Sequence, residues 1–237
     1  MGRSGDPATL VVCASLAGVP RRGSLADWIG PPGSGRAAVT WAADVDTLAA
    51  ATAAGLSSDI LALAVDHAWL DSKATLRRMV HAARQAVPGL EAVVLRGPRP
   101  LTQASLLAEE GIRVAAVDTS DDTRRGSRRP APDGWRCHNP VWGLWEVRTD
   151  PPPPRGVVGW LVHGSMPRLR SAALHVLDAG AVPVDRPPGG RLERWLAWAS
   201  RRVAGGRLRT VPLPHLAGLL ARGGQPPVSG SVLKAAA

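Results

Sequence analysis

The 237-residue sequence contains no phenylalanine and no tyrosine, and three further residue types are scarce. Lysine occurs twice, asparagine once and isoleucine three times, at Lys73, Lys234, Asn139, Ile29, Ile60 and Ile112. The missing and scarce residues have AT-rich codons, whereas the abundant alanine, glycine, proline and arginine have GC-rich codons. A GC-rich genome is the simplest explanation, and part of the arginine excess then reflects composition rather than function.

Long apolar runs and cysteine pairs are also missing. No apolar run approaches the ~18 residues that a membrane-spanning helix needs, so we expect no membrane partner. The segment Met1–Pro7 lacks the apolar core of a signal peptide, which predicts a cytoplasmic location. Cys13 and Cys137 are far apart and form no CxxC pair. This spacing excludes a zinc ribbon and gives no indication of a disulfide framework.

Positive charge is in excess. Lys and Arg number 29 against 19 Asp and Glu, which gives a net charge of +10 and a sequence pI of about 11.4. Such a balance is typical of proteins with an anionic partner such as nucleic acid. The densest basic run, Arg124 to Arg129, has no aromatic residue within it to stack bases, which favours a solvated surface run. Nucleic-acid binding therefore rests on charge alone.

The hydrophobic pattern alternates between strands and helices. Strands are expected at 9–15, 38–42, 60–65, 91–95, 112–117, 143–147, 157–162, 173–177 and 208–211, and helices at 44–54, 71–86, 102–110, 191–203 and 213–220. Short connections in such an alternation imply parallel strands with right-handed crossovers. Seven or eight of these nine candidate strands in one domain predict a (β/α)-barrel spanning residues 1–222, followed by a flexible tail at 223–237.

The segment Asp118–Pro140 is too long for a passive connection. It is rich in arginine and proline and has no apolar periodicity, so it is either a functional loop or a disordered insert. We expect it to be mobile above the site. Its acidic start, Asp118 to Asp122, lacks the spacing and glycine of a calcium loop and is interpreted as solvated.

Residues that follow the strands are the candidates for chemistry, because ligands of βα folds bind at the carboxyl ends of strands. Asp66 and His67 could bind a metal or move a proton, or Asp66 could cap a turn while His67 packs against Trp69. Arg96 could hold an anionic group with its fork of donors, or could be a surface arginine. Trp142 could stack on a sugar ring or pack in the interior.

Three segments in this order carry a family resemblance. Ala62 to Leu70, Val94 to Pro98 and Leu174 to Asp178 resemble the second, third and late motifs of polysaccharide deacetylases, the NodB-homology family. The resemblance implies a barrel of the glycoside hydrolase/deacetylase type. It also implies that His67 is a metal ligand, that Arg96 orients a catalytic aspartate and that His175 assists as a general acid. The substrate-binding candidates are then Asp66, Trp69 and Trp142.

The sequence departs from the family at the metal centre. Leu63 stands where the resemblance expects the first histidine, and the first strand ends in Val12-Cys13-Ala14-Ser15 where the family has two aspartates. One histidine cannot hold a catalytic zinc that needs three protein ligands, unless a carboxylate such as Asp44 or Asp46 moves in. We therefore expect no cofactor, with weakly held zinc as the alternative.

Three functional interpretations remain at this point. The first is a deacetylase-like domain that is catalytically degenerate and binds carbohydrate. The second is an active hydrolase, with or without metal, that removes acetyl groups from an amino sugar through a rearranged site. The third is a basic nucleic-acid-binding protein. Metal analysis distinguishes the first two, and salt-dependent DNA binding would support the third.

Overall fold

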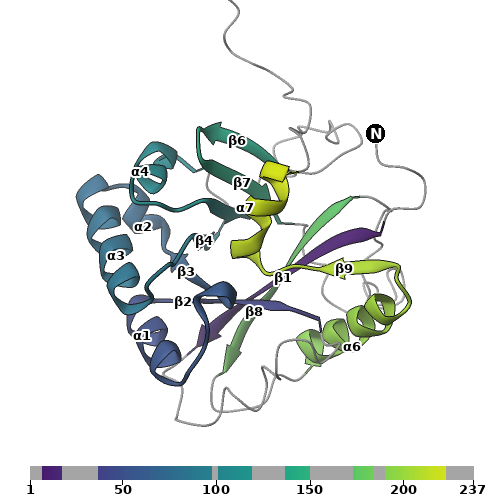
Figure 1. Ribbon diagram of the computed structural model, residues 1–237. Coiled ribbons are helices and arrows are strands. Elements are labelled where there is room, and N and C mark those ends of the chain that lie inside the picture. The colour runs from purple at the N-terminus through teal and green to yellow at the C-terminus, as the bar shows by residue number, and fades with distance from the viewer. Residues whose placement is uncertain are drawn as a thin grey trace, which may run out of the picture.

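The computed structural model describes residues 7–17, 37–97, 101–118, 137–149, 173–183 and 190–222. The strands, labelled as in Figure 1, are β1 (Ala8–Ala17), β2 (Val39–Ala43), β3 (Leu61–Val65), β4 (Ala92–Leu95), β5 (Val114–Val117), β6 (Cys137–Val141), β7 (Leu144–Arg148), β8 (Leu174–Pro183) and β9 (Leu208–Thr210). The helices are α1 (Val45–Ala53), α2 (His67–Leu70), α3 (Lys73–Ala86), α4 (Ala104–Glu109), α6 (Gly190–Ala204) and α7 (Leu213–Arg222), and a 3₁₀ turn, η1 (Ser58–Ile60), precedes β3. None of the helices in these ranges is long and apolar enough to cross a membrane.

All described strands belong to one mixed sheet. Its order is β6-β7-β5-β4-β3-β2-β1-β8, and β9 pairs with β1 outside this path. From β1 to β5 neighbouring strands follow chain order and run parallel, as the strand–helix alternation predicts. The path ends at β6 and β8, which are not paired with each other within the described ranges. The expected (β/α)-barrel of about seven strands is thus confirmed in part, because the described strands form a curled half-barrel whose closure they do not show.

The sheet has two different faces because side chains alternate along each strand. One face, here called the convex face, carries large residues such as Leu10, Trp41 and Leu63. Helices α1, α3, α4 and α6 cover it, and Figure 1 shows the first three along one side of the sheet. The other face, here called the concave face, carries mainly small residues, among them Cys13 and Ala64, and α7 packs against it.

Local sequence signals account for most helix ends. Asp44 caps α1 by accepting a hydrogen bond from the Thr47 N–H at 2.8 Å, and Ser72 caps α3 through the Thr75 N–H at 3.3 Å. The helix expected at 102–110 begins later, at Ala104. Gln103 precedes α4, and it makes no side-chain capping bond because its amide reaches the Leu70 carbonyl.

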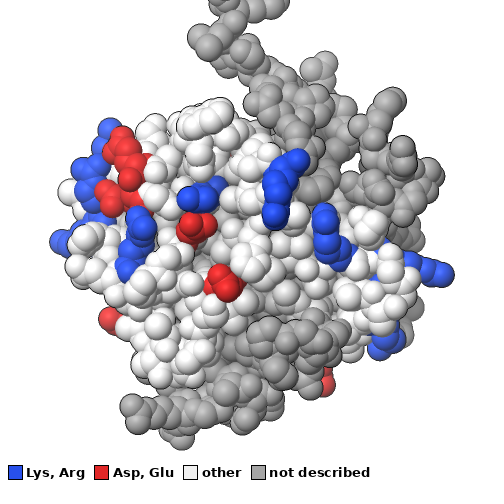
Figure 2. Space-filling model, in the orientation of Figure 1, with Lys and Arg blue, Asp and Glu red and all other residues white. Residues whose placement is uncertain are grey.

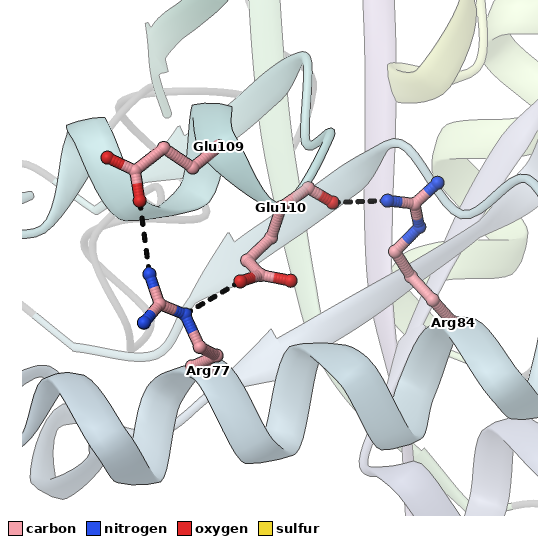
Figure 3. Close-up of polar contacts among 4 residues, drawn as sticks. All are labelled: Arg77, Arg84, Glu109 and Glu110. Atoms are coloured by element: carbon pink, nitrogen blue, oxygen red, sulfur yellow. Dashed lines mark hydrogen bonds and ion pairs between the residues drawn. The ribbon is translucent and has the colours of Figure 1, made fainter.

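Charged side chains connect the outer helices. Arg77 of α3 contacts Glu109 at 3.1 Å and Glu110 at 2.8 Å, and Arg84 donates to the Glu110 carbonyl oxygen (Figure 3). These contacts tie the end of α4 to α3 on the outside of the helix layer. Because Arg77 is more than half exposed, the contacts orient the two helices but contribute little to stability.

Two strand predictions need correction. Residues 137–140, which the sequence pattern places in the long loop, form most of β6, an edge strand that pairs antiparallel with β7. The sequence pattern does not predict this strand because it contains Pro140, and proline is disfavoured in strands except at an edge. The strand expected at 173–177 continues to Pro183. The strand expected at 157–162, most of the loop and the tail at 223–237 lie outside the described residues.

Candidate functional site

Three of the predicted site residues lie at one end of the sheet. Asp66 and His67 directly follow β3, and Arg96 directly follows the neighbouring parallel strand β4. The Arg96 N–H donates to the Val65 carbonyl oxygen at 3.0 Å, so the two strand ends are joined by a hydrogen bond. The expectation that His67 and Arg96 share one edge of the sheet is confirmed.

Asp66 has a structural role as the N-terminal cap of α2. Its Oδ1 accepts a hydrogen bond from the Ala68 N–H at 2.9 Å and so begins α2. Trp69, on the same short helix, is half-buried and packs against the convex-face core. The indole is therefore held by the protein interior rather than presented to a ligand at the concave face. For Asp66 the capping interpretation is confirmed, and for Trp69 the structure shows packing.

His67 is held in an unusual setting. Both of its ring nitrogens are buried and have no hydrogen-bond partner among the described residues. The ring lies so close to Gly97 that a Cβ added there would overlap His67 Nε2. Gly97 also has a φ of +91°, a conformation that glycine adopts without strain. The sequence Arg96-Gly97 thus allows the imidazole to approach the backbone beside Arg96, and it leaves two polar atoms unsatisfied by the described part of the chain.

A further carboxylate, Asp178, lies within β8 directly before a β-bulge. Along β1, Cys13 pairs with Asp178 and Ser15 pairs with Ala181, so β8 contains one extra residue. Gly180, with a φ of +79°, absorbs the irregularity, and its N–H donates to Asp178 Oδ1 at 2.8 Å. Bulges of this kind redirect a side chain and are frequent beside functional sites.

The electrostatic surroundings of Asp178 locate it relative to other strands. Partial burial raises its pKa, and the nearby Asp118 raises it further. The Gly180 N–H and the Arg96 guanidinium act in the opposite direction on the pKa. Cys13, fully buried beside it, has a raised pKa because of burial first and of Asp178 second.

The electrostatic coupling of Asp178 agrees with the curl of the sheet. Four strands separate β8 from β5 in the sheet, which would place them about 24 Å apart if the sheet were flat. Charges interact effectively only within about 10 Å at moderate ionic strength. An influence of Arg96 and Asp118 on the pKa of Asp178 therefore fits a curled half-barrel. We call Arg96, Asp118 and Asp178 the mouth triad.

Two predicted site residues lie at the opposite end of the sheet. His175 pairs with Leu10, near the beginning of β1, because β8 starts at Leu174 and runs parallel to β1. Trp142 occupies the turn before β7, whose residue Trp145 pairs with the first residue of β5. It is 93% exposed. His175 therefore lies near the amino end of β8, whereas His67 and Arg96 follow the carboxyl ends of β3 and β4.

The residues present do not fit the metal centre that the resemblance implies. Leu63 and Ala14 are fully buried in the convex-face core, and neither side chain has a ligand atom to offer beside His67. Within the described ranges, no three His, Cys, Asp or Glu side chains gather where they could hold a metal ion. Asp44, the candidate replacement ligand, caps α1 instead.

Sequence reasoning misses the partnership of Asp118 and Asp178. The sequence pattern places Asp118 in a solvated loop and Asp178 beyond the end of a strand. The available signal is Asp178-Ala179-Gly180, because a glycine within a strand pattern often indicates a bulge.

Comparison with known proteins adds little. No family model matches the chain, and no curated protein matches it. Among solved structures, the chain is similar to 4-alpha-glucanotransferase from Thermococcus litoralis at 12% identity and a TM-score of 0.45. The likeness covers 86% of this chain and 37% of that chain. Membership of the polysaccharide deacetylase family is not shown.

Proposed function

We propose that this chain is a carbohydrate-binding domain with a deacetylase-like half-barrel and no metal-dependent hydrolytic activity. The observation that carries the proposal is the group Asp66, His67 and Arg96, which follow the neighbouring parallel strands β3 and β4 at the end of the sheet where ligands of βα folds bind. Carboxylates and a guanidinium are suited to the hydroxyl groups of a sugar, since they accept and donate charge-assisted hydrogen bonds.

The donor set favours binding over deacetylation. A deacetylase of the resembled type needs a metal-bound water and a base. Leu63 and Ala14, at the positions of the first histidine and of one aspartate, face the convex core, and the described residues around His67 offer no group of three ligands. The second interpretation, an active hydrolase with a rearranged site, becomes the outcome that the experiment below must test.

The charge distribution favours a sugar over a polyanion as the ligand. Two of the three residues in the mouth triad are carboxylates, which repel phosphates. On the face shown in Figure 2, the Lys and Arg side chains are separated by uncharged and acidic surface. A polyanion that neutralises several phosphates requires adjacent cations, so this face does not suggest a nucleic-acid interface.

Calorimetric titration with chitooligosaccharides tests the proposal. We expect saturable binding by the wild-type protein and at least tenfold weaker binding by Arg96→Ala. The matched control is Arg113→Ala, because Arg113 precedes β5 at the opposite end of the sheet, where it contacts Glu91 at 3.3 Å. No acetate should be released from acetylated oligomers. Absence of binding, or equal losses in both variants, contradicts the proposal, and acetate release above background supports an active hydrolase.

A further inference from the structure

Charge is distributed unevenly between two parts of the chain. Residues 190–222, which form α6, β9 and α7, contain seven arginines and one acidic residue, Glu193. Residues 37–118 contain seven basic and nine acidic residues. A composition bias of the genome acts on the whole sequence, so it does not explain this difference. An asymmetry of this kind within one chain points to an anionic partner for the basic segment.

Four of these arginines gather where α6 turns into β9, a turn that Figure 1 shows at the outer edge of the molecule. Arg201 and Arg202 lie in the last turn of α6, Arg207 directly precedes β9, and Arg209 is the middle residue of β9. All four are exposed. We call these four residues the arginine corner.

A hydrogen-bonded turn holds the backbone of the arginine corner together. The Arg207 N–H donates to the Arg202 carbonyl oxygen at 3.0 Å, and Gly206 between them has a φ of +68°. A positive φ at the residue after a helix, with this bond across it, is the helix end that glycine favours. The Arg209 guanidinium donates to the Thr9 hydroxyl of β1 at 3.0 Å. The corner therefore rests on regular structure on both sides of the turn.

The positive charges of the arginine corner are not neutralised by the described part of the chain. Arg202 lies over the Trp198 ring at 5.0 Å, Arg209 reaches only a hydroxyl, and none of the four forms an ion pair within the described ranges. In contrast, Arg113 contacts Glu91 at 3.3 Å. Adjacent cations without acidic partners are the arrangement that a polyanion requires.

The residues between the arginines narrow the class of partner. Ala204, Gly205 and Gly206 are exposed and small, so the corner offers no apolar centre for a protein interface and no apolar face for insertion into a membrane. Trp198 is buried, which leaves no aromatic ring to stack on the bases of a single strand. Phosphates presented on the outside of a duplex need neither feature.

We propose that the arginine corner binds the phosphate backbone of a nucleic-acid duplex. Guanidinium forks match phosphate oxygens, and contacts to the backbone alone carry no sequence preference. The corner lies at the amino end of the sheet, because Leu208 of β9 pairs with Ala8 at the start of β1. The proposed sugar site follows the carboxyl ends of β3 and β4, so the inference goes beyond the proposed function and does not depend on it.

Fluorescence anisotropy with a short labelled duplex DNA of random sequence tests the proposal on the full chain. We expect the logarithm of the association constant to fall against the logarithm of the salt concentration with a slope of about −3 to −4, since each neutralised phosphate contributes about −0.9. Arg201→Ala and Arg207→Ala should each make the slope shallower by about one and weaken binding at low salt at least threefold.

Arg113→Ala is the matched control. It removes the same charge from an exposed position at the amino end of the sheet, but its guanidinium is paired with Glu91, so the slope should not change. Arg201 and Arg207 make no side-chain hydrogen bond or ion pair with the described residues, and circular dichroism checks that their variants keep the fold.

Three outcomes overturn the inference. The first is no salt-dependent binding of the duplex. The second is an equal loss in Arg113→Ala, which would assign binding to net charge rather than to the corner. The third is tighter binding to vesicles of anionic phospholipid than to DNA, with the same two variants weakened, which would make the corner a membrane contact. Titration with chitooligosaccharides is a separate measurement, so failure of the sugar site leaves this test intact.

Discussion

The two faces of the sheet differ in the size of the residues that they carry. On the convex face, leucine, valine and tryptophan fill the space under α1, α3, α4 and α6. On the concave face, alanine, cysteine and valine line strands that, among the described helices, α7 alone covers, and charged residues follow at the carboxyl end. Small residues let the sheet curl and let a ligand approach, whereas large residues fix the helices. The convex face thus serves stability and the concave face leaves room for function.

The largest expected loss of stability comes from placing a charged residue on the convex face of the sheet. Ala14→Asp puts a carboxylate into the fully buried convex core and should cost at least about 4 kcal/mol, because no partner can compensate its desolvation. Ser15→Asp, one residue on and only half-buried, should cost less than about 2 kcal/mol. Urea unfolding measures both variants. Equal losses would mean that the faces do not differ in this way.

A smaller effect is expected where His67 meets the backbone. Gly97→Ala should destabilise by about 2–3 kcal/mol, since it combines a positive φ with a collision at His67 Nε2. Gly143→Ala is the matched control, because Gly143 has a φ of +90° but no atom within 4 Å of an added Cβ. It should cost about 1–2 kcal/mol. Adding His67→Ala to Gly97→Ala should recover the difference, and no recovery would refute the close approach.

Asp178→Asn should slightly stabilise the protein at neutral pH. A raised pKa means that the folded state holds this proton more tightly than the unfolded chain, so the ionised carboxylate opposes folding above that pKa. The gain should be below about 1 kcal/mol because the side chain is partly solvated. It should vanish as the pH falls below the ordinary range of aspartate. Urea unfolding at pH 7 and pH 3 measures it, and destabilisation at pH 7 would contradict the electrostatic assignment.

The smallest effect is expected outside the helix layer. Arg77→Ala removes both contacts from α3 to the end of α4 and should cost no more than about 1 kcal/mol, because the pair is exposed (Figure 3). Thermal unfolding in low and high salt measures the loss. A larger loss, or one that high salt leaves unchanged, would show that these contacts hold the convex layer together.

Much of the fold is predictable because convex-face strands and amphipathic helices carry strong hydrophobic patterns. The strands near 61–65 and 92–95 and the helix at 73–86 agree with prediction within a few residues. The edge strand β6 and the second half of β8 are not predicted. Pro140 and Gly180 indicate turns in the sequence, and only the neighbouring strands of the folded sheet show that they belong to strands. Closure of the barrel stays a prediction, because strand count does not specify whether the last strand meets the first.

The candidate site is only partly predictable for a related reason. Asp66, His67 and Arg96 follow short, regular strands, and their shared edge is predicted from that position alone. Asp178 lies inside β8, beside a bulge, and the sequence pattern ends this strand at residue 177 because the nearby Gly180 indicates a turn. His175 and Trp142 are assigned to the site by motif and by residue type, and strand register places both at the other end.

The position of β1 has a consequence for how the chain folds. The first strand pairs with β2, but also with β8 and with β9, and Arg209 of β9 donates to the Thr9 hydroxyl across 200 residues of sequence. Contacts between residues so far apart in sequence slow folding, because the chain loses the entropy of closing a long loop before the strands pair. During synthesis β1 emerges long before two of its three partners. Its unpaired backbone edge must then be shielded until β8 and β9 arrive, which makes this strand the point of greatest aggregation risk on the ribosome.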